Sequence, residues 1–237
     1  MIPEIDFVTL DDCHTASDVT VVIDVCRAFT TAAYAFGAGA ERIYVTGTVQ
    51  EALDLKNRIP GALAMGEVEG EYIPGFDFGN SPVELSRAEI AERTLVQRTS
   101  AGTQGIVRST GARHLFAASF AVAGATVRAI QRRDPRRVTF VVTGRHSSDP
   151  RYGDEDHACG AYMAALLRGE RPNVQDYMTW KPDWLDAHHL ALASEPRRAL
   201  LLDDLQLCMT LDHFDFALHV TRQGGLLVME KEYDPLP

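Results

Sequence analysis

The strongest constraint on the fold is an alternation of short apolar runs with helix-length segments along the chain. The run at 19–25 (VTVVIDV) is apolar at nearly every position, which is typical of a strand covered on both faces of a sheet. A segment of small and aromatic residues at 28–40 has the length of a helix, and 42–46 is again apolar. This order predicts an α/β protein with three α/β/α layers and a mainly parallel, mixed sheet, with antiparallel pairing at the ends of the sheet.

The same pattern continues through the sequence without an internal repeat or a low-complexity linker, so we expect a single domain over residues 1–237. Strands are expected at 4–10, 19–25, 42–46, 62–65, 93–99, 113–118, 137–142, 214–221 and 226–233. Helices are expected at 28–40, 49–58, from 102 onward, 120–132 and 154–168. Residues 66–82 predict a long irregular loop, 143–153 a polar loop, and 170–206 give weaker, mainly helical signals.

Composition and charge exclude several classes of partner. The chain has 46% hydrophobic and 24% charged residues, which is the composition of a globular protein. A formal net charge of −10 argues against nucleic acid and anionic membranes as partners. No apolar run reaches the roughly 18 residues of a membrane span, and the N-terminal residues lack the core of a signal peptide. The four scattered cysteines favour neither disulfides nor structural zinc, so we expect a cytoplasmic protein.

Ligands of parallel α/β sheets bind beyond the carboxyl ends of the strands, so the loops after the strands hold the candidate site residues. In the first such loop, Asp24 ends an apolar run and Arg27 follows three residues later. A carboxylate there can hold a metal ion, and a guanidinium can bind a planar anion through two hydrogen bonds. Thr30 adds a hydroxyl near the start of the next helix, where amides attract phosphate. A buried Asp24–Arg27 pair beside helix-capping threonines is the structural alternative, and the sequence leaves both open.

The second loop carries acidic residues among glycines. Glu67, Asp77 and Glu84 lie in GEVEG and GFDFGNSPVE, where glycine lets the backbone approach a ligand closely. Carboxylate oxygens suit Mg²⁺, which keeps several waters and takes further oxygens from substrate phosphates. An ordinary solvated acidic loop is the alternative. Structureless loops of this length are uncommon unless they are functional or disordered, which favours a site.

Two further loops contribute candidates. Thr99 and Thr103 flank Gly102 where a strand runs into a helix, a pattern that can cradle phosphate or simply cap the helix. Glu155 and Asp156 begin a later helix, where the helix dipole alone explains acidic residues. The alternative is that one of these two acids turns inward as a metal ligand or a base.

Several familiar phosphatase signatures are missing. No cysteine begins a C-x₅-R loop, no strand ends in D-x-D-x-[TV], and there is no G-x-x-x-x-G-K-[ST]. Arg145 and His146 stand in GRH rather than RHG, which excludes the histidine phosphatases and leaves Arg145 a weaker candidate for binding acid groups. His188 and His189 lack an H-E-x-x-H frame, so we interpret them as surface or packing residues.

Five motifs together resemble those of the 2-phosphosulfolactate phosphatase (ComB-like) family. They are VVIDVCRAFTT, GEVEG, GFDFGNSPVE, RTSAGT and EDHACGA, and the resemblance runs over nearly the whole chain. GFDFGNSPVE is the most specific, and the order and spacing of all five strengthen the case. The resemblance implies an α/β/α fold and Mg²⁺-dependent hydrolysis of (2R)-2-phospho-3-sulfolactate to 3-sulfolactate and phosphate. In methanogenic archaea this reaction belongs to coenzyme M biosynthesis.

The resemblance also implies site residues, position by position. The catalytic residues would be Asp24, Arg27, Asp77, Glu155 and Asp156, and the metal ligands Asp24, Glu67 and Asp77. The substrate-binding residues would be Arg27, Thr30, Asn80, Ser81, Thr99, Gly102 and Thr103. The division of metal and base roles among the acids stays open, as does the choice between direct attack by water and a phosphorylated aspartate.

Two departures from the family pattern bear on the substrate. Family members usually show TTNGT where this chain has TSAGT, so an amide side chain is missing at Ala101. The family also tends to place Asn early in a later helix, where this chain has apolar residues around Val122. A phosphatase for another phospho-acid and a non-catalytic anion-binding protein therefore stand as alternatives. We expect a small, multiply anionic substrate and, as the commonest assembly, a homodimer.

Overall fold

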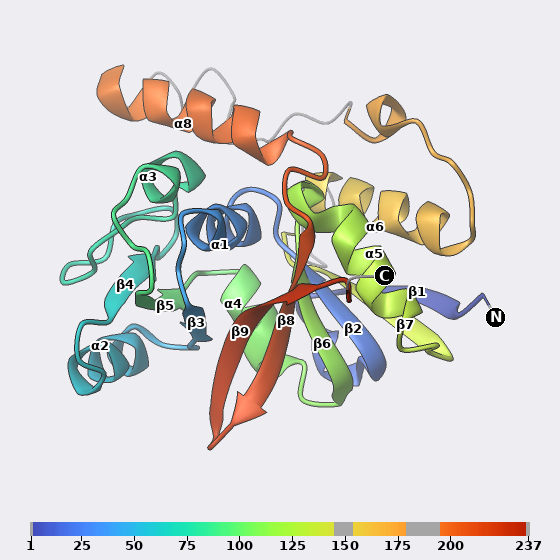
Figure 1. The fold of residues 1–237 in the computed structure, drawn as a ribbon, viewed down its shortest axis with the longest axis horizontal. Coiled ribbons are helices and arrows are strands. Elements are labelled where there is room, and N and C mark those ends of the chain that lie inside the picture. Colours follow the sequence, from blue (N-terminus) through green and yellow to red (C-terminus); the bar gives the residue numbers. More distant parts are fainter. Residues whose placement is uncertain (1, 145–153, 179–194, 236–237) are drawn as a thin grey trace.

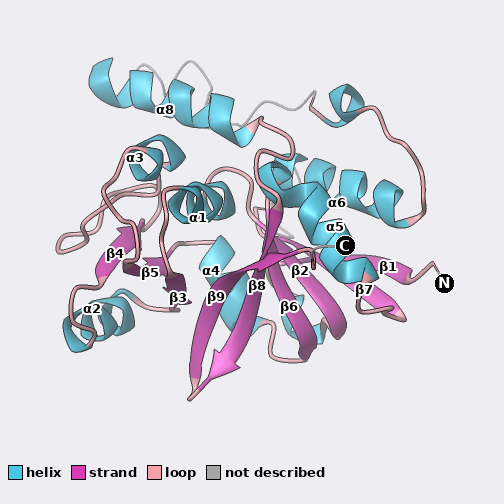
Figure 2. Cartoon of the chain, in the orientation of Figure 1, coloured by secondary structure: helices cyan, strands magenta, loops and turns pink. Residues whose placement is uncertain are grey.

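The computed structural model describes residues 2–144, 154–178 and 195–235. A nine-stranded mixed sheet runs through it in the order β1-β7-β2-β6-β8-β9-β3-β5-β4, with helices on both faces (Figures 1 and 2). The strands are β1 Glu4–Thr9, β2 Asp18–Ile23, β3 Arg42–Val45, β4 Leu63–Gly66, β5 Thr94–Arg98, β6 Ala112–Ala118, β7 Arg137–Val142, β8 Phe216–Gln223 and β9 Leu226–Tyr233. The α-helices are α1 Ala28–Gly37, α2 Val49–Arg58, α3 Pro82–Ser86, α4 Gly102–Arg108, α5 Ala123–Gln131, α6 Asp154–Leu167 and α8 Glu195–Cys208. The predicted α/β class and mixed sheet are confirmed.

Strand β2 lies inside the sheet and explains why its sequence is almost continuously apolar. It pairs in parallel with β6 on one side and with β7 on the other. Val19, Val21, Val22 and Ile23 are all fully buried because helices cover both faces. A strand in this place ends where the covering helices leave an opening, and its carboxyl end therefore points into a loop region that can bind a ligand.

The antiparallel strands lie in the middle of the sheet, so the prediction of antiparallel pairing at its ends is wrong. The β8–β9 hairpin turns at Gly224 and Gly225, which both have positive φ, and it pairs antiparallel with β6 and β3. Phe216 to Leu218 and Leu227 to Met229 are buried on both faces, as interior strands must be. The hairpin joins a parallel group β1-β7-β2-β6 to a second parallel group β3-β5-β4.

The carboxyl ends of β2 and β5 meet although three antiparallel steps separate the two parallel groups. In a flat sheet, three such steps would send the ends of β2 and β5 to opposite edges. Five strand steps lie between them, and a twist of about 20–25° per step turns the second group by roughly 100–125°. The Nε2 atom of Gln97 in β5 donates a hydrogen bond of 2.8 Å to the carbonyl oxygen of Ala28, directly after the β2 loop.

Two apolar layers hold the helices on the sheet. On one face Phe29 and Phe36 of α1 pack with Ile106 of α4 against the strands. On the other face α5 and α6 supply residues such as Ile130 and Met163 to a second cluster. Helix α2 packs through Ala52 and Leu55 on the β3-β5-β4 group. The result is the three-layer arrangement that the sequence predicts.

Within the described residues, the predicted helices and loops agree with the structure except in three places; all but the first two residues of the predicted polar loop 143–153 lie outside the described part of the chain. The expected helix at 120–132 is divided into a 3₁₀ turn, Phe120–Val122, and α5. The segment directly after the loop 66–82 forms the short helix α3, whose N-cap is Ser81. The weak helical signal of 170–206 corresponds to a 3₁₀ turn at Val174–Tyr177 and to α8, which extends from 195 to 208.

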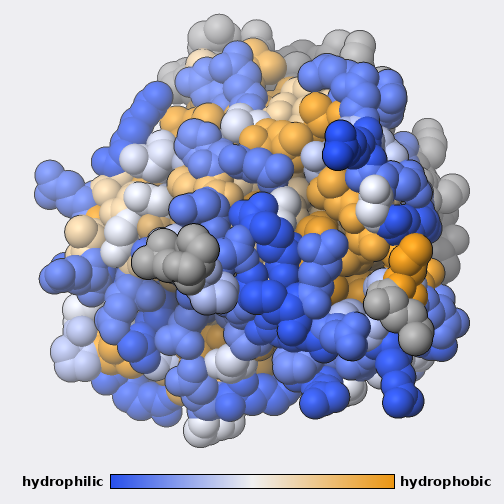
Figure 3. Space-filling view, turned by 45° about the vertical axis from the view of Figure 1, so that its right-hand side comes forward, coloured by the Kyte–Doolittle hydropathy of each residue, from blue (hydrophilic) through white to orange (hydrophobic). Residues whose placement is uncertain are grey.

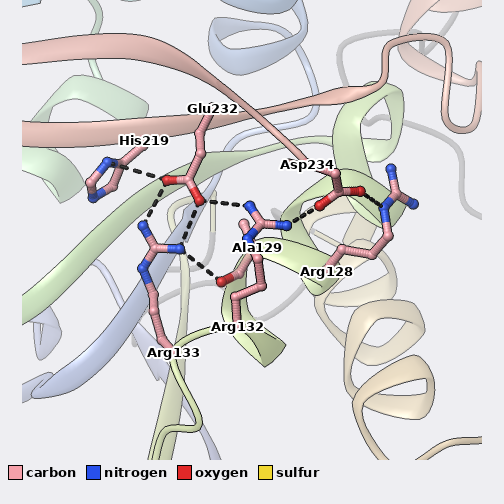
Figure 4. A network of polar contacts seen from close by, with 7 residues as sticks. All are labelled: Arg128, Ala129, Arg132, Arg133, His219, Glu232 and Asp234. Carbon is pink, nitrogen blue, oxygen red and sulfur yellow. Dashed lines mark hydrogen bonds and ion pairs between the residues drawn. The ribbon is translucent and has the colours of Figure 1, made fainter. Parts of the chain in front are cut away.

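A network of charged side chains fastens the C-terminal strand to α5 (Figure 4). Arg133 donates two hydrogen bonds, of 2.8 and 2.6 Å, to the carboxylate of Glu232, and Arg132 donates a third of 2.7 Å. Asp234 pairs with Arg128 and Arg132. Burial raises the pKa of Glu232, but the hydrogen bonds from Arg133 and Arg132 outweigh it and hold this pKa at about 2.

The face of the molecule drawn in Figure 3 is mixed in hydropathy. Hydrophilic residues cover most of the face drawn in Figure 3, and hydrophobic residues gather in smaller areas between them. Among the residues that the structure describes, no helix combines the length and the apolar character needed to span a bilayer.

Candidate active site

A cavity opens where the loops after β2, β4 and β5 meet helix α8. It consists of two adjoining hollows of about 250 and 260 Å³ that share Arg27, Glu67, Gly70, Asn80 and Leu201. The first hollow is also lined by Asp24, Cys26, Ser100 and Ala101, and the second by Tyr72, Ser81, Glu84 and Leu200, among others. We call the two hollows together the interloop cavity. Three of the four loops singled out in the sequence therefore contribute to one site.

Asp24 is placed at the carboxyl end of β2 and is nearly buried. Its Oδ1 atom accepts a hydrogen bond of 2.9 Å from the amide of Ala28, and the amide of Gly102 also donates to its carboxylate. Burial raises the pKa of Asp24, these backbone bonds lower it, and the negative charge of Glu67 raises it again, to about 6. The carboxyl group thus lies in a place where a neighbouring positive charge would stabilise its ionised form.

Glu67 connects two of the loops around the cavity. Its Oε1 accepts a hydrogen bond of 2.6 Å from the amide of Ser100, and its Oε2 accepts bonds from the Gly70 amide at 2.6 Å and the Ser100 hydroxyl at 3.1 Å. Arg98 donates to the carbonyl oxygen of Glu67 at 2.8 Å. These bonds fix the carboxylate at the cavity wall, facing the same hollow as Asp24.

Asn80 adds an amide to the same wall and is 8% exposed. Its Oδ1 atom is buried and accepts no hydrogen bond from any residue in the described part of the chain. A buried carbonyl-type oxygen without a donor is unfavourable, which is why such atoms are rare in folded proteins. An oxygen of this kind at a cavity wall is suited to a cation or to a ligand that donates a hydrogen bond.

Arg27 places its positively charged guanidinium at the wall of the interloop cavity and is held by Asp204, which lies outside the cavity. Its Nη1 atom donates a hydrogen bond of 2.7 Å to Oδ2 of Asp204, in helix α8. Oδ1 of Asp204 accepts bonds from the Ser81 hydroxyl at 2.6 Å and the Val83 amide at 3.1 Å. Ser81 in turn caps α3 by accepting a bond of 3.1 Å from the Glu84 amide.

Asp77 lies outside the interloop cavity and is engaged elsewhere. Its Oδ2 atom is 2.8 Å from Nζ of Lys56 in α2 and accepts a hydrogen bond of 2.7 Å from the amide of Ala64 in β4. The predicted metal site shared by Asp24, Glu67 and Asp77 is therefore not formed with Asp77, because the structure does not bring Asp77 together with the other two acids. Asp77 instead fastens the loop after β4 to the strand itself.

The threonines expected to bind substrate are fully buried and bonded to the protein. The Thr30 hydroxyl donates to the carbonyl oxygen of Val25 at 2.8 Å. Oγ1 of Thr99 accepts from the Thr103 amide at 3.1 Å, and Oγ1 of Thr103 accepts from the Thr99 amide at 2.9 Å and donates to the Thr99 carbonyl oxygen at 2.9 Å. None of the three lines the interloop cavity, so they shape the turns that border it. The Gly102 amide, expected to bind phosphate, donates instead to the carboxylate of Asp24.

Asp156 lies behind the cavity and ties the β2 and β7 loops together. Its Oδ1 accepts a hydrogen bond of 2.7 Å from the Val25 amide, and its Oδ2 accepts one of 3.0 Å from the Gly144 amide. Burial, with the negative charges of Glu155 and Asp24, raises its pKa well above the ordinary range. Glu155 is half-buried in the first turn of α6, and neither acid lines the interloop cavity. Arg145 lies outside the described residues.

Three residues at or beside the interloop cavity are not among the predicted site residues: Asp204, Ser100 and Leu201. Asp204 lies in the stretch with weak helical signals, where the only clue is a pair of acids amid leucines (LLLDDLQLC). Ser100 belongs to RTSAGT, but its bonds to Glu67 depend on a contact between two loops. Leu201 brings an apolar wall from α8. All three contribute through segments whose approach local sequence does not reveal.

The donors of the cavity fit a divalent cation of the oxygen-binding kind. The described residues contain no group of three His, Cys, Asp or Glu side chains arranged to hold a metal. Two carboxylates, Asp24 and Glu67, and the unpartnered Asn80 oxygen do share one hollow. Mg²⁺ is commonly bound through one or two carboxylates, with water and substrate phosphate completing its coordination. The set therefore suits Mg²⁺ better than a cation that requires a complete cage of protein ligands.

Comparison with known proteins identifies the family of the chain. The family model described as 2-phosphosulpholactate phosphatase matches residues 7–223. A protein of Carboxydothermus hydrogenoformans named "Probable 2-phosphosulfolactate phosphatase" is 31% identical over 226 residues, which cover 89% of each chain. Relatives of the same name are 34% identical in Bacillus subtilis and 38% in Deinococcus radiodurans; each match spans 65% of the relative, and 65% and 67% of this chain respectively. The chain belongs to the 2-phosphosulpholactate phosphatase family.

Proposed function

We propose that the protein hydrolyses the phosphate monoester of a small anionic hydroxy acid, with 2-phospho-3-sulfolactate as substrate and 3-sulfolactate and phosphate as products. The observation that carries this proposal is the convergence of Asp24, Glu67, Asn80 and Arg27 on the interloop cavity. Family membership supplies the reaction class. Hollows of about 250 and 260 Å³ suit a small acid rather than a macromolecule.

A cation is needed because the protein and its proposed substrate are both negatively charged. The formal net charge of the chain is −10, and Asp24 and Glu67 add negative charge to the wall of the cavity itself. Asp24, Glu67 and Oδ1 of Asn80 would hold Mg²⁺. When bound, Mg²⁺ would neutralise charge on the phosphoryl oxygens and favour ionisation of a water molecule. Asp77, which pairs with Lys56, is not part of this proposed set.

Arg27 would bind an acid group of the substrate. A guanidinium is planar, stays charged at all physiological pH values and matches carboxylate, sulfonate and phosphate oxygens in pairs. The bond from Nη1 to Asp204 holds the side chain so that it faces both hollows. Fixing it before the substrate arrives lowers the entropy lost on binding.

The remaining expected site residues would keep these groups in place. Asp156 fixes the backbone of the loops after β2 and β7 through the amides of Val25 and Gly144. The hydrogen bonds between Thr99 and Thr103 fix the turn around Gly102. The bonds from Ser100 to Glu67 hold the β4 and β5 loops together. Catalytic rates depend steeply on such positioning, since a displacement of 1 Å can cost about 100-fold.

The proposal is tested by phosphate release from 2-phospho-3-sulfolactate by the full chain, with Mg²⁺ and with a chelator. We expect turnover that requires the metal, and a kcat/KM higher than for phosphoglycerates and phospholactate measured in parallel. A higher kcat/KM for another phospho-acid would move the substrate assignment to that acid. Metal-independent turnover would contradict the role given to Asp24, Glu67 and Asn80.

A non-catalytic anion-binding role is the second candidate, and Ala101 is the observation that favours it. Ala101 lines the cavity and is the N-cap of α4, yet it has no side chain that could bond there, where the family usually has Asn. Calorimetry with 3-sulfolactate and with 2-phospho-3-sulfolactate separates the two roles. Binding of both compounds without release of phosphate would support the non-catalytic role.

A further inference from the structure

Asp204 is the most completely buried acid that contacts a residue of the interloop cavity. Its side chain is 0% exposed and accepts three hydrogen bonds, from Nη1 of Arg27, the hydroxyl of Ser81 and the amide of Val83. A carboxylate at such a depth is unfavourable unless it is paired and hydrogen-bonded. The structure supplies both, which explains how the charge is tolerated inside a contact between helices.

The three bonds divide between the two oxygens of the carboxylate. Oδ1 takes the bonds from Ser81 and Val83, which fasten Asp204 to the start of α3. Oδ2 takes the bond from Arg27. One oxygen thus anchors Asp204 to α3, and the other binds the guanidinium of Arg27 at the cavity. Anchoring alone would be complete with the first oxygen, so the second indicates a role directed at Arg27.

The bonds also connect three segments that are far apart in the sequence. Arg27 belongs to the loop after β2, Ser81 and Val83 to the entry of α3, and Asp204 to α8. Helix α8 lies above α1 and α3 in Figure 1, and α3 contacts both α1 and α8. The same helix brings Leu200 and Leu201 to the cavity wall. Correct docking of α8 therefore completes the cavity and holds its arginine at the same time.

We propose that Asp204 is a positioning residue for substrate binding: it holds the guanidinium of Arg27 toward the interloop cavity. This inference rests on the proposed function, because it assigns the substrate-binding arginine a fixed orientation. Arg side chains lose considerable rotamer entropy when they become ordered. Asp204 orders Arg27 before substrate binds, so its contribution falls mainly on binding and not on the chemical step.

Replacing Asp204 with Asn is the direct test. Asp204→Asn keeps the size of the side chain and an oxygen for Ser81 and Val83, but it places an amide NH₂ where Arg27 needs an acceptor. We expect KM for 2-phospho-3-sulfolactate to rise about tenfold or more, with kcat within about threefold of the wild type. Asp203→Asn is the matched control, since Asp203 is the exposed neighbour in the same helix.

A double-mutant cycle separates positioning from simple stabilisation. Arg27→Lys alone should raise KM, because an ammonium cannot reproduce the paired bonds of a guanidinium. If Asp204 acts through Arg27, the double variant should have nearly the KM of Arg27→Lys. Additive effects on KM would overturn the inference, and so would an unchanged KM in Asp204→Asn. Denaturation curves check that each variant is folded under the conditions of the assay.

The same variants can be measured without turnover. Calorimetry with 3-sulfolactate should show a dissociation constant raised about tenfold in Asp204→Asn and unchanged in Asp203→Asn. If the wild type binds 3-sulfolactate but releases no phosphate from 2-phospho-3-sulfolactate, the proposed hydrolysis fails. The binding measurement with 3-sulfolactate still decides the role of Asp204. If Asp204→Asn is largely unfolded, Asp204→Glu serves instead: it keeps the charge, but its longer side chain displaces the carboxylate and with it the guanidinium of Arg27, so an unshifted dissociation constant together with an unshifted KM would overturn the inference.

Discussion

The carboxylate of Asp24 leaves no room for a β-carbon at Gly102: a Cβ built there would lie 2.7 Å from Oδ2 of Asp24 and 2.9 Å from Cβ of Ala28. Both neighbours are fixed, since Asp24 is bonded to the Ala28 amide at the start of α1. The glycine of the RTSAGT motif is thus explained by contact between two loops. It allows the entry of α4 to approach the acid at the end of β2.

This contact predicts that Gly102→Ala inactivates the protein without unfolding it. The added methyl group must displace Asp24 or the entry of α4, and we expect kcat/KM for phosphate release to fall about 100-fold. Gly47→Ala is the control, because the nearest atom to a Cβ at Gly47 is 3.6 Å away. Equal activity of the two variants would mean that the approach of Gly102 to Asp24 is not needed.

Glu67 and Asp77 are both acids of the same loop, and the structure predicts different effects when each is replaced. Glu67→Gln should reduce phosphate release at least 100-fold, because the loss of its charge removes a proposed cation ligand beside Asp24. Asp77→Asn should retain activity within a few-fold and lose about 1 kcal/mol of stability or less, since its pair with Lys56 is partly exposed. Steady-state rates and urea denaturation of both variants provide the measurement. The opposite ranking would place Asp77 at the metal.

The role of Asn80 predicts a specific change in metal dependence. Asn80→Ala removes the unpartnered oxygen from the cavity wall, and we expect the dissociation constant for Mg²⁺ to rise about tenfold, with little loss of stability. Calorimetric titration of the substrate-free protein with Mg²⁺ measures this directly. Asn57→Ala, at an exposed position of α2, is the control. An unchanged metal affinity would leave Asn80 as a hydrogen-bond donor to substrate.

Most helices and strands could be predicted from the sequence, because apolar periodicity and helix caps depend on residues that are close together in the chain. The apolar run at 19–25 requires cover on both faces, and β2 is covered so. The capping box of α2, formed by Thr48 and Glu51, likewise involves only adjacent residues. Strand order is different, since it depends on which neighbours pair. The β8–β9 hairpin therefore could be recognised from its glycines, but its place between β6 and β3 could not.

The candidate site was likewise predictable only in part. Asp24, Arg27 and Glu67 stand at strand ends, and the rule for carboxyl ends of strands identified them. It could not distinguish Asp77 from Glu67, because only the contact with Lys56 turns Asp77 away. It also could not find Asp204, whose partner Arg27 is 177 positions away in the chain.

The network around Glu232 predicts that its stabilising effect depends on pH. The pKa of Glu232 in the folded protein is about 2, below its ordinary value of 4.5. The ionised carboxylate therefore stabilises the folded state above pH 4.5, and this contribution is lost as the pH falls through about 2. Glu232→Gln should lower the free energy of unfolding by about 1–2 kcal/mol at pH 7, a modest value because the group is partly solvated.

Urea denaturation at pH 7 and at pH 3 tests this dependence. The difference in free energy of unfolding between the wild type and Glu232→Gln should be smaller at pH 3, because below pH 4.5 the unfolded wild type takes up a proton at Glu232, whereas the folded state, with a pKa of about 2, keeps the carboxylate mostly ionised. Glu230→Gln is the control on the same strand, since Glu230 forms no ion pair with the described residues. A difference that stays constant between the two pH values would mean that Glu232 stabilises the C-terminal strand by packing of its side chain and not by its charge.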